Sequence, residues 1–452
     1  MLQASRARGW GGKMAQKGDF AVVWSFAIAS DEETRLSSPA DRSISLATAI
    51  VKKLVDAGHI ALFAGGWVRD FLLKHPSDDI DIATSASVEQ VQALFPKTIP
   101  VGVAFGIVIV VEDDHQFEVA TFRKESEYVD GRRPQRIEPA TPEEDALRRD
   151  FTINGMFWDP LSDCLFDYVQ GERDLKLGLI RAIGNPHERI FEDRLRMMRA
   201  VRYSTRFHFP IEAATREAIL AHASALLPSV AMERVWQEFK KLSQFEHFDR
   251  GLLSLYDLGL LTTIFPDLKS CSQAEITSRI SYLDAFPPSA PTIAELLELF
   301  PSYSLEQLLQ LCDYLKLSRH EKDLVGFLHH ARKLLEMPTQ WAATLEPIEW
   351  AHFYSHTHSE LSLHIHAAHL SAPERSSFLH NHETRRLSLM PAITRIQTQR
   401  PVVNAELLLT EGILPGKKMG LLLKEAERIA VNNNLDNAQK VLEQLKKSSF
   451  WS

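Results

Sequence analysis

The residues best suited to chemistry are two aspartates, Asp79 and Asp81, at alternate positions of a predicted strand. Side chains of a strand alternate between its two faces, so both carboxylates point the same way while Ile80 and Ile82 point into the core. Two carboxylates on one face repel each other and favour a shared cation, and hard oxygen ligands suit Mg²⁺. The spacing therefore predicts a metal site with catalytic capacity at Asp79 and Asp81.

A glycine pair, Gly65-Gly66, lies just before these aspartates, between a short apolar run at 60–64 and a predicted helix at 67–74. Glycines at a strand-to-helix turn allow close approach of a ligand to the backbone, and free N–H groups there can bind an anion. A divalent metal beside a phosphate-binding turn is the arrangement that nucleotidyl transfer requires. On these residues alone, two ordinary solvated turns are the alternative.

The string GGWVRDFLLKHPSDDIDI at 65–82 resembles the first signature of the class II tRNA CCA-adding nucleotidyltransferase and bacterial poly(A) polymerase family. That signature reads G-G-x-V-R-D, a spacer, then D-x-D. The resemblance implies that Gly65, Gly66 and Arg69 contact the phosphates or sugar of a nucleotide. A purely structural pair between Arg69 and Asp70 is the alternative.

A second signature, RRDFTIN, begins at residue 148 and contains Arg149 and Asp150. Arginine suits a triphosphate because it is always charged and forks onto oxygen atoms. The resemblance implies that both residues bind the nucleotide, with Asp150 accepting from a 2′-hydroxyl or serving as a third catalytic acid. Glu118, on a neighbouring predicted strand, is the other candidate for a third carboxylate, and a solvated glutamate is its alternative.

A third signature, ERIFEDRLRMMRAVRYSTRF, covers residues 188–207. Its spacing of three predicts that four charged residues share one helix face: Asp193, Arg196, Arg199 and Arg202. An aspartate accepts from an exocyclic amino group and an arginine donates to a ring acceptor, so one such pair can read both cytosine and adenine. The resemblance makes all four nucleotide contacts, with Asp193 and Arg196 as the template for the base. A solvated arginine face is the alternative.

The head that positions these residues is predicted to be α+β, a nucleotidyltransferase head with a small mixed sheet. Helices are expected at 43–57 and 85–95, and strands at 101–111 and 116–122. Polar residues 125–138 predict a mobile loop, which resembles one that helps the family switch between CTP and ATP. Two short strands are expected within 164–184.

All-α neck, body and tail domains are expected to follow the head. The predicted divisions are a disordered leader at 1–42, a catalytic head at 43–160, a nucleotide-recognising neck at 161–245, a helical body at 246–385 and a helical tail at 386–452. A helix at 230–242 resembles the one that braces the recognition helix. The tail turn at 412–418 carries two lysines and resembles the segment that rests on the tRNA elbow. The many body histidines are interpreted as helix surface or core.

The composition describes a globular chain of 452 residues with a net charge of −8. A negative net charge argues weakly against a nucleic-acid partner. Arginines cluster at 132–149 and 189–206, however, and a local cluster of basic residues matters more for nucleic-acid binding than the net charge of the chain. No apolar run approaches the ~20 residues of a membrane span. Three scattered cysteines fit reduced thiols, so a cytoplasmic location is expected.

The leading interpretation is an enzyme that adds CMP and AMP from CTP and ATP to the tRNA 3′ end and releases pyrophosphate, using two Mg²⁺ ions. RNA partners are then the tRNA 3′ end and elbow. A poly(A) polymerase, or an enzyme adding only CC or only A, shares the same signatures. From other classes, a catalytically inactive RNA-binding protein and an antibiotic-type nucleotidyltransferase remain as alternatives. The sequence does not determine the oligomeric state.

Overall fold

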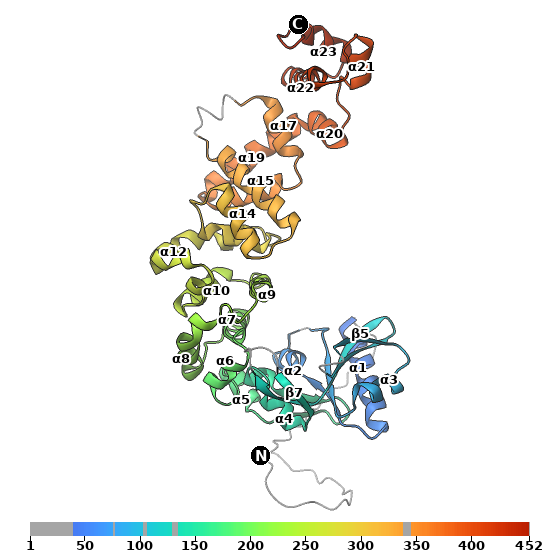
Figure 1. The fold of residues 1–452 in the computed structure, drawn as a ribbon, viewed down its shortest axis with the longest axis vertical. Coiled ribbons are helices and arrows are strands. Elements are labelled where there is room, and N and C mark those ends of the chain that lie inside the picture. The colour runs from blue at the N-terminus through green and yellow to red at the C-terminus, as the bar shows by residue number, and fades with distance from the viewer. Residues whose placement is uncertain (1–38, 76, 103–105, 129–133, 338–344, 452) are drawn as a thin grey trace, which may run out of the picture. The chain divides into compact units, whose positions relative to one another are not determined.

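A computed structural model of the chain describes residues 39–75, 77–102, 106–128, 134–337 and 345–451 (Figure 1). It divides into two compact units, the first ending at Ser229 and the second beginning at Val230. The predicted leader lies outside the described residues except for its last four, 39–42, which belong to a helix. The finer domain boundaries stay predictions.

The first unit contains a seven-stranded mixed sheet, which confirms the predicted α+β class. Strands β2 and β5 are parallel, whereas the other neighbouring strands are antiparallel. The strands, in their order across the sheet, are β3 (Thr98–Gly102), β4 (Ile107–Glu112), β5 (His115–Thr121), β2 (Asp81–Thr84), β1 (Ala61–Ala64), β8 (Met156–Asp159) and β9 (Cys164–Asp167).

Three predicted helices pack around this sheet through their apolar residues. Helix α1 (Pro39–Asp56) contacts β1 and β2 and buries residues one helical turn apart, such as Ile50 and Leu54. Helix α2 (Gly66–Leu72) packs on β1 and β8. Helix α3 (Val88–Leu94) begins with a capping box between Ser87 and Gln90, which satisfies the N–H groups at its start.

Three local predictions were wrong. Polar residues 125–138 lie mostly in a hairpin of β6 (Arg123–Tyr128) and β7 (Pro134–Pro139), because backbone pairing needs no apolar alternation; residues 129–133 lie outside the described chain. The expected strand at 101–111 is divided between β3 and β4, with Gly106 at a φ of 71° before β4 begins. Residues 164–184 contain one strand, β9, and a helix, α5 (Gly171–Leu177).

The remaining elements of the first unit are helical. They are α4 (Pro142–Leu147), η2 (Thr152–Asn154), α6 (Pro186–Glu192), α7 (Arg196–Phe207), α8 (Ala213–His222) and η3 (Ala223–Ala225). Helix α7 buries an apolar side that includes Met198 and Val201. It also lines up four arginines, at 196, 199, 202 and 206, along its length.

The described part of the second unit is entirely helical, as expected. Its elements are α9 (Met232–Leu242), α10 (Phe248–Asp257), α11 (Leu260–Ile264), η4 (Pro266–Ser270), α12 (Gln273–Ile280), η5 (Leu283–Ala285), α13 (Thr292–Leu296), η6 (Leu297–Leu299), α14 (Leu305–Tyr314), α15 (Arg319–Leu335), α17 (Pro347–Ser355), α18 (Ser359–Ala368), α19 (Ala372–Ser388), α20 (Met390–Thr398), α21 (Ala405–Thr410), α22 (Lys417–Asn432) and α23 (Ala438–Leu445). The predicted helix–turn–helix near the end is α21, a glycine-bounded turn and α22. None of the helices described in either unit is long and apolar enough to cross a membrane.

Candidate active site

A small cleft of about 180 Å³ lies on the first unit at the start of β2 and beside β5. Its polar lining consists of two carboxylates and three guanidinium groups, while the short side chains of Ala64, Ala83 and Ala120 keep it open. The polar residues are Asp81, Glu118, Arg123, Arg148 and Arg149. Opposite charges therefore face one cavity next to the glycine turn.

Asp79 and Asp81 have the alternation that the sequence predicts. Ile80 and Ile82 are buried at 3% and 0% exposure, whereas Asp79 is exposed and Asp81 is half-buried. The strand itself begins only at Asp81, so Asp79 lies in the segment that enters it. Both carboxylates are therefore turned away from the core.

The electrostatics of Asp81 indicate concentrated negative charge. Burial, followed by repulsion from Glu118 and Asp79, raises its pKa to about 7, although Arg149 opposes the rise. Burial and repulsion from Asp79 also raise the pKa of Glu118, while Arg123 lowers it. A group of carboxylates that resists ionisation in this way gains stability from a bound cation.

Glu118 reaches this group because of strand pairing. In the parallel pair β2–β5, Ile82 is opposite Val119, so the preceding residues, Asp81 and Glu118, are neighbours. The lining of the cleft includes both side chains. The sequence offered Glu118 and Asp150 as a third carboxylate, and the structure brings Glu118, but not Asp150, into this lining.

The turn between β1 and α2 approaches the cleft closely at Gly65. This residue has a φ of 67° and a ψ of −125°, a conformation suited to glycine. A Cβ atom built there would lie 2.9 Å from Nη1 of Arg149 and 3.9 Å from Oδ2 of Asp81. Absence of a side chain at Gly65 therefore leaves room for a cation, an anion and the arginine to meet.

The donor set fits a divalent metal held by few protein ligands. Asp79 and Asp81 supply hard oxygen atoms, and burial, followed by repulsion from Glu118 and Asp79, raises the pKa of Asp81, an effect that a bound cation would offset. The cleft does not bring three metal-ligating side chains within 4.8 Å of one another. In the described part of the chain, the one group that meets this criterion is in the second unit and consists of His247, Asp249 and Asp284. Mg²⁺ commonly completes its shell with substrate phosphates and water, so two carboxylates suffice.

Arg69 is buried, with 2% exposure, and forms the structural pair that the sequence left as an alternative. Its guanidinium binds Asp70 at 2.9 Å and donates to Oδ1 of Asn154. Arg206 of α7 binds the other oxygen of Asp70 at 3.0 Å. Its contact with a nucleotide stays a prediction, whereas the link between α2 and α7 is present. Gly66, the first residue of α2, lies beside Arg69.

Asp150 forms a second link to α7. Its carboxylate accepts from the backbone N–H of Phe151 at 2.8 Å, from Asn154 at 3.0 Å and from Nε of Arg199 at 2.7 Å. Burial alone would raise the pKa of Asp150, but Arg199 and Asn154 hold it well below its ordinary value. Asp150 therefore remains ionised, and it holds Arg199 in place.

The predicted recognition face needs one correction. Asp193 is not on the helix of the arginines: α6 ends at Glu192, and Asp193 has an extended φ of −145° before α7 begins at Arg196. Its Oδ1 accepts from the N–H of Leu195 at 3.1 Å and its carbonyl accepts from the N–H of Arg196 at 3.0 Å, so Asp193 begins the turn that leads into α7. Simple periodicity did not reveal this break because the spacing of three runs through it.

Arg196 and Arg202, the first and last arginines of the predicted face, differ in their surroundings. Arg196 donates to Glu192 at 2.7 Å, to the carbonyl of Arg189 at 2.8 Å and to the carbonyl of Arg148 at 3.0 Å. Arg202 is 7% exposed, with its guanidinium 4.4 Å from the ring centre of Tyr203. Roles for both in nucleotide binding stay predictions.

Sequence reasoning missed three residues that shape the cleft. Buried Asp145 holds Arg148 at 2.7 Å and Arg149 at 2.9 Å, and these arginines lower its pKa against the effect of burial. Nε of Arg148 also donates to the carbonyl of Arg123, which contributes the third guanidinium. The signal was available for Asp145, because spacings of three and four on a helix place it beside both arginines.

Fold and site together define a nucleotidyltransferase: a mixed sheet presents paired carboxylates beside a glycine turn and arginines. Comparison with known families agrees. Residues 61–181 match the poly A polymerase head domain, and residues 208–272 match a probable RNA and SrmB-binding site of polymerase A.

Relatives known as CCA-adding enzymes match most of the chain. One from Pediococcus pentosaceus is 32% identical over 86% of this chain and 94% of its own, and one from Streptococcus gordonii is 33% identical over 86% and 93%. Another, from Bacillus velezensis, is 44% identical, and the match covers 50% of this chain and 56% of that relative's length. The chain belongs to the CCA-adding enzyme and poly(A) polymerase family.

Solved structures agree on the fold. A Bacillus stearothermophilus CCA-adding enzyme in complex with CTP is 28% identical with a TM-score of 0.74, covering 91% of this chain and 98% of that one. A Thermotoga maritima CCA-adding enzyme is 21% identical, with a TM-score of 0.64 over 90% of this chain and 98% of its own, and shares the fold.

Proposed function

We propose that this chain is a tRNA nucleotidyltransferase that adds CMP and AMP, from CTP and ATP, to the tRNA 3′ end and releases pyrophosphate. The observation that carries the proposal is a group of mutually repelling carboxylates, Asp79, Asp81 and Glu118. Asp81 and Glu118 line a cleft that Arg149 also lines. The names of the matched relatives, and the CTP complex of one of them, support the choice of substrates. An inactive RNA-binding protein would have no need of this charged group.

Asp79 and Asp81 would hold Mg²⁺, proposed to be two ions; when bound, the metal would supply charge that lowers the pKa of the RNA 3′-hydroxyl and neutralises the leaving pyrophosphate. Arg149 is fixed by Asp145 at 2.9 Å and reaches the Gly65 turn, where it can bind the triphosphate. Gly65 and Gly66 admit that triphosphate without a steric barrier. The chain's own residues thus position the nucleotide and stabilise charge.

Base selection is assigned to Asp193 and Arg196, with Arg199 and Arg202 on the same helix as further nucleotide contacts. Support comes from the fixed position of Arg196, whose hydrogen bonds to Glu192 and two carbonyls leave its guanidinium little freedom. Asp193 is held by the N–H of Leu195 directly before the same helix. A pair held in this way can present one donor and one acceptor to cytosine or adenine.

Two further proposals concern the RNA contact of the tail and the location of the protein in the cell. The turn that precedes Lys417 and Lys418 is proposed to contact the tRNA elbow, because it is bounded by Gly412 and Gly416 and carries Leu414 at 80% exposure. A cytoplasmic location is proposed because all three cysteines are free thiols.

The test is incorporation of each labelled nucleoside triphosphate, with Mg²⁺, onto tRNA transcripts that lack CCA, CA or A, beside an unstructured oligo(A) primer. The expected result is ordered addition of C, C and A to tRNA and then a stop. Long A tracts would identify a poly(A) polymerase, and addition of C alone or A alone a split-function enzyme. Wild-type protein as inactive as Asp79→Ala and Asp81→Ala variants would remove the catalytic proposal altogether.

A further inference from the structure

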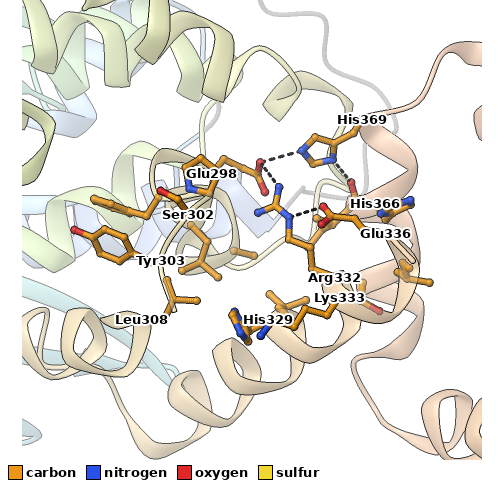
Figure 2. A pocket seen from close by; sticks show the side chains of 18 of the residues that line it. Glu298, Ser302, Tyr303, Leu308, His329, Arg332, Lys333, Glu336, His366 and His369 are labelled. Carbon is orange, nitrogen blue, oxygen red and sulfur yellow. Dashed lines mark hydrogen bonds and ion pairs between the residues drawn. The ribbon is translucent and has the colours of Figure 1, made fainter. Parts of the chain in front are cut away.

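The second unit contains a cavity of about 450 Å³ that the proposed function does not use (Figure 2). It lies between η6, the start of α14, α15 and the end of α18, and is here called the α15–α18 cavity. Its volume is in the range of pockets that hold small molecules. Every residue that lines it follows Val230, whereas every candidate catalytic residue precedes Ser229.

One side of the α15–α18 cavity is basic. His329, Arg332 and Lys333 stand three and four residues apart on α15, so they share a face of that helix, and α18 adds His366 with His369 just beyond it. Five basic side chains thus border one cavity, and they face two carboxylates.

The two carboxylates are already engaged, as the dashed lines of Figure 2 show. Glu298 accepts from His369 at 2.9 Å and lies 3.7 Å from Arg332, while Glu336 binds Nε of Arg332 at 2.9 Å. Lys333 has no hydrogen bond or ion pair to any residue that the structure describes. Positive charge therefore remains available for a ligand.

The lining histidines differ in their surroundings: burial lowers the pKa of His369, but Glu298 outweighs that effect and raises it, whereas His329 has basic neighbours. Burial, then Lys333, His330 and Arg332, lower the pKa of His329, so the neighbouring charge is net positive. Burial lowers the pKa of His366; Glu336 opposes that effect, and His369 and Arg332 add to it. A bound anion would relieve this repulsion, and the imidazoles could then donate hydrogen bonds to it.

The opposite side of the cavity is apolar and aromatic. Figure 2 shows Tyr303 and Leu308 across from Arg332 and Lys333. The ring of Tyr303 lies 4.8 Å from that of Phe300, and its hydroxyl donates to Asp267, which holds the ring in place. A fixed ring of this kind is a stacking surface for another flat ring.

We propose that the α15–α18 cavity is a nucleotide-binding site separate from the catalytic cleft, with the base on the Tyr303 side and the phosphate at Lys333 and His329. A flat ring joined to a phosphate at a short distance is the ligand that satisfies both sides at once. Two sources offer this chemistry, a free mononucleotide and one nucleotide of an RNA strand.

The test uses photolabelling of the full-length chain with 8-azidoadenosine 5′-monophosphate in the presence of EDTA, which weakens metal-assisted binding in the catalytic cleft. Peptides that carry the label are then identified by mass spectrometry. The expected result is saturable labelling within residues 297–308 or 328–336, displaced by AMP more strongly than by adenosine or inorganic phosphate. Displacement by oligo(A) at lower concentration than AMP would identify RNA as the source, and the reverse order a free nucleotide.

Matched variants test each side of the cavity. Lys333→Glu should weaken labelling of these peptides about tenfold or more, because a charge-assisted contact becomes a repulsion. Lys424→Glu, an exposed lysine of α22 outside the cavity, should leave it unchanged. Tyr303→Leu should weaken labelling, whereas Tyr303→Phe, which keeps the ring, should not. Label confined to the first unit, or equal labelling of wild type and Lys333→Glu, would overturn the proposal.

Discussion

Replacing Gly65 with alanine tests how tightly the turn between β1 and α2 is built around the cleft. At a φ of 67° and a ψ of −125°, a combination that residues with a Cβ rarely adopt, an alanine is strained, which costs about 1–3 kcal/mol. The new Cβ would also lie 2.9 Å from Nη1 of Arg149, closer than a normal contact. Arg149 must then move, although two hydrogen bonds to Asp145, at 2.9 and 3.1 Å, hold it.

The displaced guanidinium adds to the cost. Weakening one charge-assisted hydrogen bond costs about 1.5–3 kcal/mol. The total expected for Gly65→Ala is therefore about 2.5–6 kcal/mol of unfolding free energy. Gly58→Ala is the matched control, because Gly58 has a φ of 89° but no atom within 4 Å of the added Cβ. It should show the backbone strain alone.

Two measurements check this expectation. Urea unfolding gives the free-energy difference for each variant, and incorporation of labelled CMP onto a tRNA transcript lacking CCA gives the activity. Gly65→Ala should lose at least tenfold in kcat/KM, since Arg149 leaves its place beside Asp81, whereas Gly58→Ala should retain wild-type activity.

A double-mutant cycle decides whether Arg149 is the cause. In an Arg149→Ala background the close contact no longer exists, so the cost of Gly65→Ala should fall to that of the backbone strain alone. A cost of Gly65→Ala that is the same in the Arg149→Ala background as in the wild-type chain would refute the reasoning.

Further expectations concern charge and metal. Asp81→Asn should stabilise the chelated protein at pH 8, because a carboxyl whose pKa is raised from 3.8 to about 7 weakens folding as pH rises through that window. About three pH units at about 1.4 kcal/mol each set an upper limit of about 4 kcal/mol, and urea unfolding in EDTA near pH 4 should show no difference. EDTA should abolish nucleotide incorporation and excess Mg²⁺ restore it, while the rise in melting temperature with Mg²⁺ should be absent in Asp79→Ala. Arg206→Ala should cost about 1–3 kcal/mol in urea unfolding because buried Asp70 loses one partner, and Arg206→Lys should recover part of it. Asp150→Asn should cost about 2–4 kcal/mol of unfolding free energy at pH 7, because Arg199 loses its counter-charge. The pKa of Asp150 is lowered in the folded chain, so the stability difference between wild type and this variant should shrink only as pH falls well below 4.

Local patterns in the sequence were sufficient for the parts of the site that depend on neighbours along the chain. Alternation placed Asp79 and Asp81 away from the core because extended chain has a period of two, and the buried Ile80 and Ile82 that alternate with them leave no other register. Gly65 marked the turn because few other residues adopt its backbone conformation. The short apolar run, the capped helix after Ser87 and the helices of the second unit follow from the same local rules.

Local patterns failed where their signal was ambiguous. The sequences of β6 and β7 show no alternation of apolar and polar residues, so their composition does not separate them from a loop. The spacing of three between Asp193 and Arg196 is the same in a continuous helix and across a break, and only backbone geometry shows that the helix ends at Glu192.

Only the tertiary structure decided which distant residues meet. Glu118 joins Asp81 because β5 runs parallel to β2, a pairing that no local pattern specifies. Arg206 reaches Asp70 across 136 positions of sequence, and Arg199 reaches Asp150 across 49, because α7 packs on the head. The sequence by itself determined which ionisable side chains are present and in which direction each points along its own strand or helix. The fold determined which of these charges lie close enough to change one another's pKa. Electrostatic coupling depends on distance and burial, and both are properties of the folded chain.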